Sequence, residues 1–75
     1  MKRINDIPDD IWALAFGCFR GDRETVQGVF MLAFGGGTLR PVAEETGRSV
    51  GKLRRSRKLF REVLEAYREE KTSPN

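Results

Sequence analysis

The sequence predicts an all-α fold, a small helical bundle that contains a helix-turn-helix and ends in a long C-terminal helix. Apolar residues recur every three or four positions along most of the chain, which is the period of an amphipathic helix. Glycines at 21, at 35–37 and at 47 divide these apolar segments into four, because glycine readily ends helices. With 75 residues the chain has room for one modest core. We take residues 1–75 as a single domain, with a polar arm at 1–6 and a disordered tail at 71–75.

The first two helices are predicted over residues 8–19 and 23–34. Pro8 suits a first helical turn, and Asp22 is the predicted N-cap of the second helix. The apolar side chains of the first helix form two adjoining stripes: Ile11, Leu14, Ala15 and Cys18, and Trp12, Phe16 and Phe19. Those of the second helix are Val26, Val29, Phe30 and Ala33, with Met31, Leu32 and Phe34 beside them. We expect both sets to be core, and the alternative for the first helix is an exposed aromatic patch that binds a partner.

The last two helices are predicted over residues 39–46 and 50–70. Thr38 and Ser49 are their predicted N-caps, and Gly47 ends the shorter one. The shorter helix turns Leu39, Val42 and Ala43 inward. The core stripe of the longer helix is Val50, Leu53, Phe60, Leu64 and Tyr67. Its second apolar stripe is Leu59, Val63 and Ala66, which lies beyond the core stripe and is free to bind another chain.

The spacing of Ala43, Gly47 and Leu53 is that of a DNA-binding helix-turn-helix. A small alanine lets two helices cross closely, the glycine supplies the positive φ of the turn, and the leucine anchors the second helix on the first. Thr46 and Arg48 occupy positions beside the turn that are usually apolar. Because an unpaired buried charge is costly, we expect the stem of Arg48 to pack while its head group reaches outward.

Positive charge is concentrated on the start of the last helix. Between residues 46 and 61 there are seven basic residues and no acidic residue: Arg48, Lys52, Arg54, Arg55, Arg57, Lys58 and Arg61. All eleven acids of the chain flank this segment, and the net charge is only +3. A strongly polarised molecule follows, and its basic helix suits double-stranded DNA, since Lys and Arg neutralise phosphates. The alternative is a solvated basic helix without a nucleic-acid role.

Helical periodicity divides the candidate DNA contacts into two sets. In a helix-turn-helix the first residues of the second helix read base edges in the major groove. The predicted base-reading residues are Ser49, Gly51, Arg54, Arg55 and Lys58. The predicted phosphate contacts, which flank them, are Thr38, Arg40, Arg48, Lys52 and Arg57. Lys2 and Arg3 of the polar arm are further candidates for backbone contacts.

Composition argues against catalysis and metal binding. The chain has one cysteine, Cys18, and no histidine, which excludes a Cys/His zinc site and a Cys-His or Ser-His nucleophile. The glycines at 35–37 lack the sequence context of a phosphate-binding loop. We therefore expect a protein that is not an enzyme and has no metal, cofactor or small-molecule substrate. No apolar run is long enough to span a bilayer; we expect no membrane partner, a cytoplasmic location and a buried free thiol at Cys18.

Residues 24–53 resemble the DNA-binding domain of the plasmid-encoded KorA/TrfB-like transcriptional repressors. The resemblance rests on a helix that runs into the glycines at 35–37, on Ala43 and Gly47 as an A-x-x-x-G turn, and on Ser49 and Gly51 at the start of the recognition helix. The adhesin regulators of the PapB type have a similar layout. The resemblance implies an all-helical, dimeric repressor that binds short palindromic operators, with Arg55 as a base-reading side chain. Because the sequence ends soon after this helix, we expect the separate dimerisation region of the family to be missing or reduced to residues 59–70.

Together these features predict a sequence-specific transcriptional regulator, a dimeric repressor that binds a palindromic operator through the helix starting near Val50. The expected homodimer contact is the second stripe, Leu59, Val63 and Ala66, and the aromatic stripe of the first helix is the second candidate. The alternative function is a protein-interaction module that binds a partner through its apolar helices.

Overall fold

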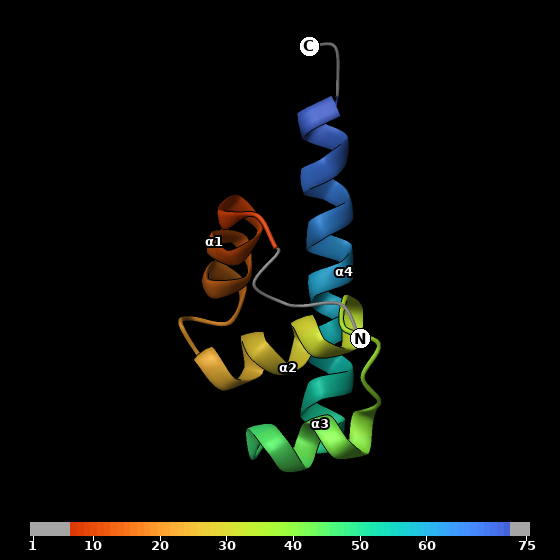
Figure 1. Cartoon of the computed structure of the whole chain (residues 1–75). Coiled ribbons are helices and arrows are strands. Elements are labelled where there is room, and N and C mark those ends of the chain that lie inside the picture. The colour runs from red at the N-terminus through yellow and green to blue at the C-terminus, as the bar shows by residue number, and fades with distance from the viewer. Residues whose placement is uncertain (1–6, 73–75) are drawn as a thin grey trace.

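The computed structural model describes residues 7–72 and contains four helices in this part of the chain. They are α1 (Asp9–Cys18), α2 (Arg23–Ala33), α3 (Leu39–Thr46) and α4 (Val50–Thr72). In Figure 1, α4 runs along the length of the molecule, α1 lies beside its middle, α2 crosses it, and α3 lies at its N-terminal end. The all-α prediction is confirmed, and the predicted helix limits agree to within two residues.

The largest difference is at the end of α4, which continues through the first two residues of the predicted tail. Tyr67 and Lys71 hold this last part of the helix against the start of α1: the Tyr67 hydroxyl donates to Asp10 Oδ2 at 2.6 Å, and the Lys71 ammonium group does so at 3.3 Å. Tyr67 is therefore half-buried with a polar partner, rather than a core residue. The predicted arm at 1–6 and residues 73–75 lie outside the described residues.

The core consists of two clusters that share α2 and α4. The larger cluster joins α1, α2 and α4, and its buried members are Ala15, Val26, Val29, Phe30, Phe60 and Leu64. The smaller one joins α2, α3 and α4 through Leu32, Val42, Ala43 and Leu53. The rings of Phe30 and Phe60 lie 5.5 Å apart at the centre of the larger cluster, within the range that favours aromatic pairs. Ala33, which was expected in the core, is exposed.

The first helix is less buried than its two apolar stripes predict. Only Ala15 is fully buried among the residues of α1, while Trp12, Phe16 and Phe19 are half-buried. Trp12 packs edge-on against Phe30, with ring centroids 4.5 Å apart. Cys18 is a free thiol, but it is half-buried rather than buried, and partial desolvation raises its pKa. The apolar stripes of α1 thus pack against the core cluster shared with α2 and α4, as predicted, but apart from Ala15 their side chains stay partly exposed.

Gly28 lies where α2 crosses both α3 and α4. A Cβ atom at this position would lie 2.7 Å from Leu53 Cδ2 and 3.4 Å from both Val42 Cγ1 and Thr46 Cγ2. The crossing is therefore so close that only glycine fits without displacement. Thr46 is buried there, and its hydroxyl donates to the Val42 carbonyl at 2.8 Å, which explains how a polar residue is tolerated beside the turn.

The turn and most of the caps agree with the sequence. Gly47 has φ 72°, and its N–H donates to the Ala43 carbonyl at 2.9 Å. The Ser49 hydroxyl accepts the N–H of Lys52 at 3.1 Å, as expected of an N-cap. Thr38 makes no side-chain cap hydrogen bond, contrary to the prediction. One of the two positions that usually donate to such a cap is occupied by Pro41, which has no N–H.

Candidate nucleic-acid interface

The outward face of α4 is defined by the residues that α4 buries. Leu53 is completely buried in the smaller cluster and Phe60 in the larger one, so residues half a turn away from them point to solvent. The outward face of α4 consists of four predicted base-reading residues: Gly51, Arg54, Arg55 and Lys58. The three charged side chains are exposed, and Gly51 is half-buried. The structure therefore places these four on one side of α4, within its first three turns.

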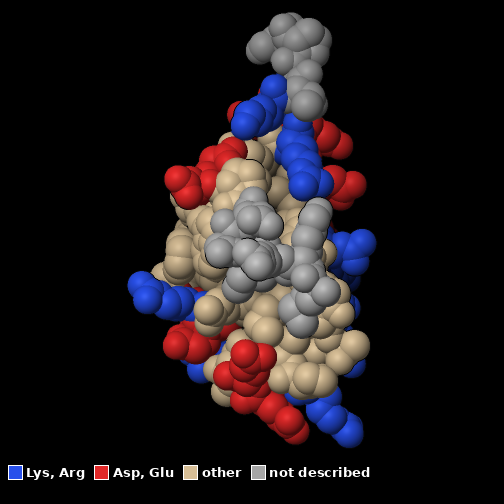
Figure 2. All heavy atoms as spheres, viewed as in Figure 1, with Lys and Arg blue, Asp and Glu red and all other residues tan. Residues whose placement is uncertain are grey.

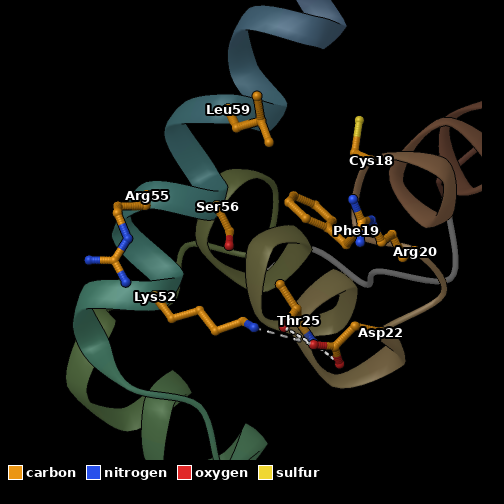
Figure 3. Close-up of a pocket in the computed structure, with 9 residues that line it drawn as sticks. All are labelled: Cys18, Phe19, Arg20, Asp22, Thr25, Lys52, Arg55, Ser56 and Leu59. Carbon is orange, nitrogen blue, oxygen red and sulfur yellow. Dashed lines mark hydrogen bonds and ion pairs between the residues drawn. The ribbon is translucent and has the colours of Figure 1, made fainter.

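Gly51 and Arg55 are neighbours on this outward face. A Cβ atom at Gly51 would lie 3.3 Å from Arg55 Nη1, so the missing side chain leaves room for the guanidinium group beside the first turn. In Figure 3 the guanidinium group of Arg55 points away from α1 and α2. Ser49, the fifth predicted base-reading residue, is exposed at the N-cap, where its oxygen accepts the Lys52 N–H. Its hydroxyl hydrogen remains a donor for a ligand.

The predicted phosphate contacts lie on several sides of this face. Thr38 and Arg40 are exposed at the start of α3. Lys52 lies on the flank of α4 that faces α1 and the start of α2, with 49% of its side chain exposed. Arg57 lies on the opposite flank and is half-buried, where it lines a cavity of about 320 Å³ together with the end of α2 and its C-cap, Phe34. Lys52 and Arg57 thus border the outward face on its two sides, while Thr38 and Arg40 lie on α3.

Arg48 differs from the prediction. Its guanidinium group binds Asp22 through two hydrogen bonds, Nη2 to Oδ1 at 2.8 Å and Nε to Oδ2 at 3.4 Å. Nη2 also lies 3.7 Å from Glu24 Oε2. The head group thus faces the N-terminus of α2 rather than reaching outward, because a carboxylate there accepts both of its donors in the paired geometry that arginine favours.

Asp22 connects this arginine to two helices. Besides binding Arg48, it accepts the N–H of Thr25 at 3.3 Å and the Thr25 hydroxyl at 2.6 Å, so it is also the N-cap of α2. The hydrogen bonds from Arg48 and Thr25 hold the pKa of Asp22 well below its ordinary value. The Lys52 ammonium group lies 3.8 Å from Asp22 Oδ2. One carboxylate therefore ties the helix-turn-helix turn and the first turn of α4 to the start of α2.

A groove runs along the flank of α4 that faces α1 (Figure 3). Its volume is about 240 Å³, and its lining residues are Cys18, Phe19, Arg20, Asp22, Thr25, Lys52, Arg55, Ser56 and Leu59. Arg20 has φ 54° and precedes Gly21 with φ 76°, a pair of left-handed residues that turns the chain sharply between α1 and α2. No sequence motif indicated this groove, because only the fold brings residues 18–22 opposite residues 52–59.

Charge is unevenly distributed over the molecular surface. Figure 2 shows one face of the molecule in the view of Figure 1, where uncharged surface separates groups of basic and acidic side chains. Positive side chains lie near its upper end and at its left and right edges, and acidic ones lie at its lower end and on both sides of its upper part. Along α4 the first half, residues 50–61, contains six basic residues and no acid, whereas residues 62–71 contain four acids and two basic residues. The helix is thus electrostatically polarised along its axis.

Comparison with known proteins gives no relative. No protein-family model, curated protein or solved structure matches the chain. The resemblance to the KorA/TrfB-like repressors therefore stays a prediction that rests on the sequence. None of the described helices has both the length and the apolar character needed to cross a membrane.

Proposed function

We propose that the protein is a sequence-specific DNA-binding transcriptional regulator that inserts the start of α4 into the major groove. The observation that carries the proposal is the outward face of α4, where Arg54, Arg55 and Lys58 are exposed together around Gly51. Arginine and lysine on such a face bind guanine O6 and N7 and neutralise phosphates. With no histidine and one cysteine, the chain has few groups for catalysis, and the proposal involves no enzymatic step, metal or cofactor.

The rest of the fold supports this use of α4. The αL conformation of Gly47 and the bond between Arg48 and Asp22 fix the angle at which α4 leaves α3. A helix held in this way loses little conformational freedom on binding, which favours affinity. Lys52 and Arg57 border the outward face, where phosphates would flank the major groove, and Thr38 and Arg40 are exposed at the start of α3 as further candidates for phosphate contacts.

The proposal includes a homodimer, because one recognition helix reads too few base pairs for useful specificity. Leu59 is 45% exposed, Val63 is half-buried and Ala66 is exposed, so this stripe has apolar surface left for a second chain. A palindromic operator, repressor activity, a plasmid-borne gene and a cytoplasmic location complete the proposal, as the resemblance to the KorA/TrfB-like family suggests.

The same apolar surface supports a second candidate function, a module that binds another protein. Its support is the exposure of Leu59 together with the half-buried aromatic residues of α1. The two functions differ in their response to salt. DNA binding weakens steeply as the salt concentration rises, whereas burial of an apolar surface does not.

Selection from a pool of random duplexes tests the main proposal. The expected result is an enriched, two-fold symmetric motif whose affinity falls with salt in proportion to the number of phosphates contacted. The matched comparison is a chain carrying Arg54→Ala, Arg55→Ala and Lys58→Ala, which keeps the buried face of α4. Failure of the wild-type chain to enrich any duplex motif would exclude sequence-specific DNA binding.

A further inference from the structure

We infer that the groove beside α4 receives the acidic second half of α4 from a second copy of the chain, so that two α4 helices pair in antiparallel orientation. The inference rests on the proposed dimer and specifies its geometry. One wall of the groove is formed by Cys18, Phe19 and Arg20, and the other by residues 52–59 of α4 (Figure 3). Apolar atoms of Phe19 and Leu59 line it beside the cationic side chains of Arg20, Lys52 and Arg55, and Asp22 also lines it, with its Oδ2 atom 3.8 Å from the Lys52 ammonium group. Such a groove suits a helix that carries both small apolar and acidic side chains.

Along this flank of α4 the spacing is that of a coiled-coil seam. Residues spaced alternately four and three positions apart share one side of a helix. On this flank of α4 they form a seam of six residues: Lys52, Ser56, Leu59, Val63, Ala66 and Glu70. Ser56 is 9% exposed, and its side chain points into the groove. The seam therefore has small or apolar residues at its centre, a cation at one end and an anion at the other.

The seam is complementary to the seam of a second copy that runs in the opposite direction. A two-fold axis midway between positions 59 and 63 places Leu59 opposite Val63 of the second copy, and Ser56 opposite Ala66. The same axis places Lys52 opposite Glu70 of the second copy. By symmetry, each dimer contains two such pairs of opposite charge. Parallel pairing would instead bring Lys52 against Lys52 and Glu70 against Glu70, and like charges at facing positions are unfavourable. Charge complementarity thus selects the second copy as the occupant and the antiparallel orientation.

The pairing is compatible with DNA binding. At about 100° per residue, the outward face of α4 lies roughly a quarter turn from the seam, so the two-fold axis turns both outward faces to the same side. The two Val50 positions are 22 residues apart along the pair, which at 1.5 Å per residue is about 33 Å. Half-sites in successive major grooves are about 34 Å apart. Arg55 lies at the border between the groove and the outward face, and its guanidinium group points away from α1 and α2.

A charge swap between two chains tests the geometry. Lys52→Glu produces two facing pairs of acids in a homodimer, and Glu70→Lys produces two facing pairs of bases. We expect each variant alone to dimerise about tenfold or more weakly than the wild type in sedimentation equilibrium, since two attractive pairs become repulsive. An equimolar mixture restores both attractive pairs, and it should form a heterodimer of near wild-type affinity.

The mixture also distinguishes a loss of pairing from a loss of folding, because adding the second variant would not restore dimerisation of an unfolded chain. Glu44→Lys is the matched control: Glu44 is exposed on α3, away from the seam, so this change should leave association unchanged. Variants that dimerise like the wild type, or a mixture that does not recover, would overturn the antiparallel pairing while leaving the dimer itself intact. A wild-type chain that stays monomeric would remove the dimer, and the duplex selection separately decides DNA binding.

Discussion

Arg48 and Asp22 are 26 positions apart in the sequence, and they form a two-point hydrogen-bonded ion pair with a shortest distance of 2.8 Å. The pair joins the turn that precedes α4 to the residue that caps α2. Because Asp22 also lies 3.8 Å from the Lys52 ammonium group, a single carboxylate holds the start of the proposed recognition helix against the rest of the fold. Its charge should matter both for stability and for the position of α4.

The first prediction concerns Asp22→Asn and pH. An asparagine still caps a helix well, so the change removes mainly the charge that binds Arg48. The pKa of Asp22 is lowered in the folded state from an ordinary value of 3.8, so the folded state binds fewer protons than the unfolded state in this range. The stabilisation is therefore fully present above about pH 4 and is lost as the pH falls further.

Thermal melting of both chains between pH 7 and pH 2 measures this effect. The wild type should melt higher than Asp22→Asn at pH 7, and the difference should shrink on acidification below pH 4. Asp9→Asn is the control, since it removes an exposed carboxylate at the start of α1 and leaves the pair of Arg48 and Asp22 intact. A gap between wild type and Asp22→Asn that stays constant down to pH 2 would contradict the role assigned to the charge.

The second prediction compares two glycines inside helices. Gly28→Ala should destabilise the fold by about 1–3 kcal/mol, because its Cβ would lie 2.7 Å from Leu53 Cδ2 and force α2 away from α4. Gly17→Ala, in α1, should be neutral or stabilising by about 0.5–1 kcal/mol, because nothing lies within 4 Å of a Cβ there and alanine favours helices. Urea unfolding of both variants measures the difference. Equal effects would show that the helices do not cross at Gly28.

The third prediction concerns the turn before α4. Gly47→Val should cost at least about 1–2 kcal/mol, because Gly47 has φ 72° and a β-branched residue resists this conformation. Gly47→Asn is the matched variant, since asparagine tolerates the left-handed region better than other residues. No atom lies within 4 Å of a Cβ at this site, so a loss seen with valine would come from the backbone and not from a clash. An unchanged melting temperature for Gly47→Val would contradict the turn.

Local signals in the sequence were sufficient for the helices and their limits. Asp22 and Ser49 cap the helices that they were expected to cap, and Gly47 has the positive φ that its place in the pattern requires. Such features depend on residues within about one helical turn, so short stretches of sequence determine them. Thr38 is the exception, where Pro41 removes one of the donors that the cap would use.

Contacts between distant residues could not be predicted in this way. The binding of Arg48 to Asp22, the contact of Tyr67 with Asp10 and the place of Arg20 in the groove all depend on how the helices pack. Gly28 carried a weak signal, because a glycine inside a helical pattern often has a packing reason. The candidate DNA residues of α4 were predictable because helical periodicity alone places them on the face opposite Leu53.

The last prediction separates base reading from phosphate contact. Arg55→Ala should weaken binding to the selected duplex by about 1–3 kcal/mol and relax the preference at one base pair, because a bidentate contact with guanine is lost. Arg40→Ala, at the exposed start of α3, should weaken binding to all duplexes by a similar factor and reduce the salt dependence by about one phosphate. Fluorescence anisotropy with the selected duplex and with one-base variants, at two salt concentrations, distinguishes these outcomes.

Because Arg55 is exposed on α4, Arg55→Ala removes no buried contact. The stability of the fold should therefore not change. If Arg55→Ala lowered affinity for every duplex equally, the arginine would contact phosphate, and another residue of the outward face would read the base.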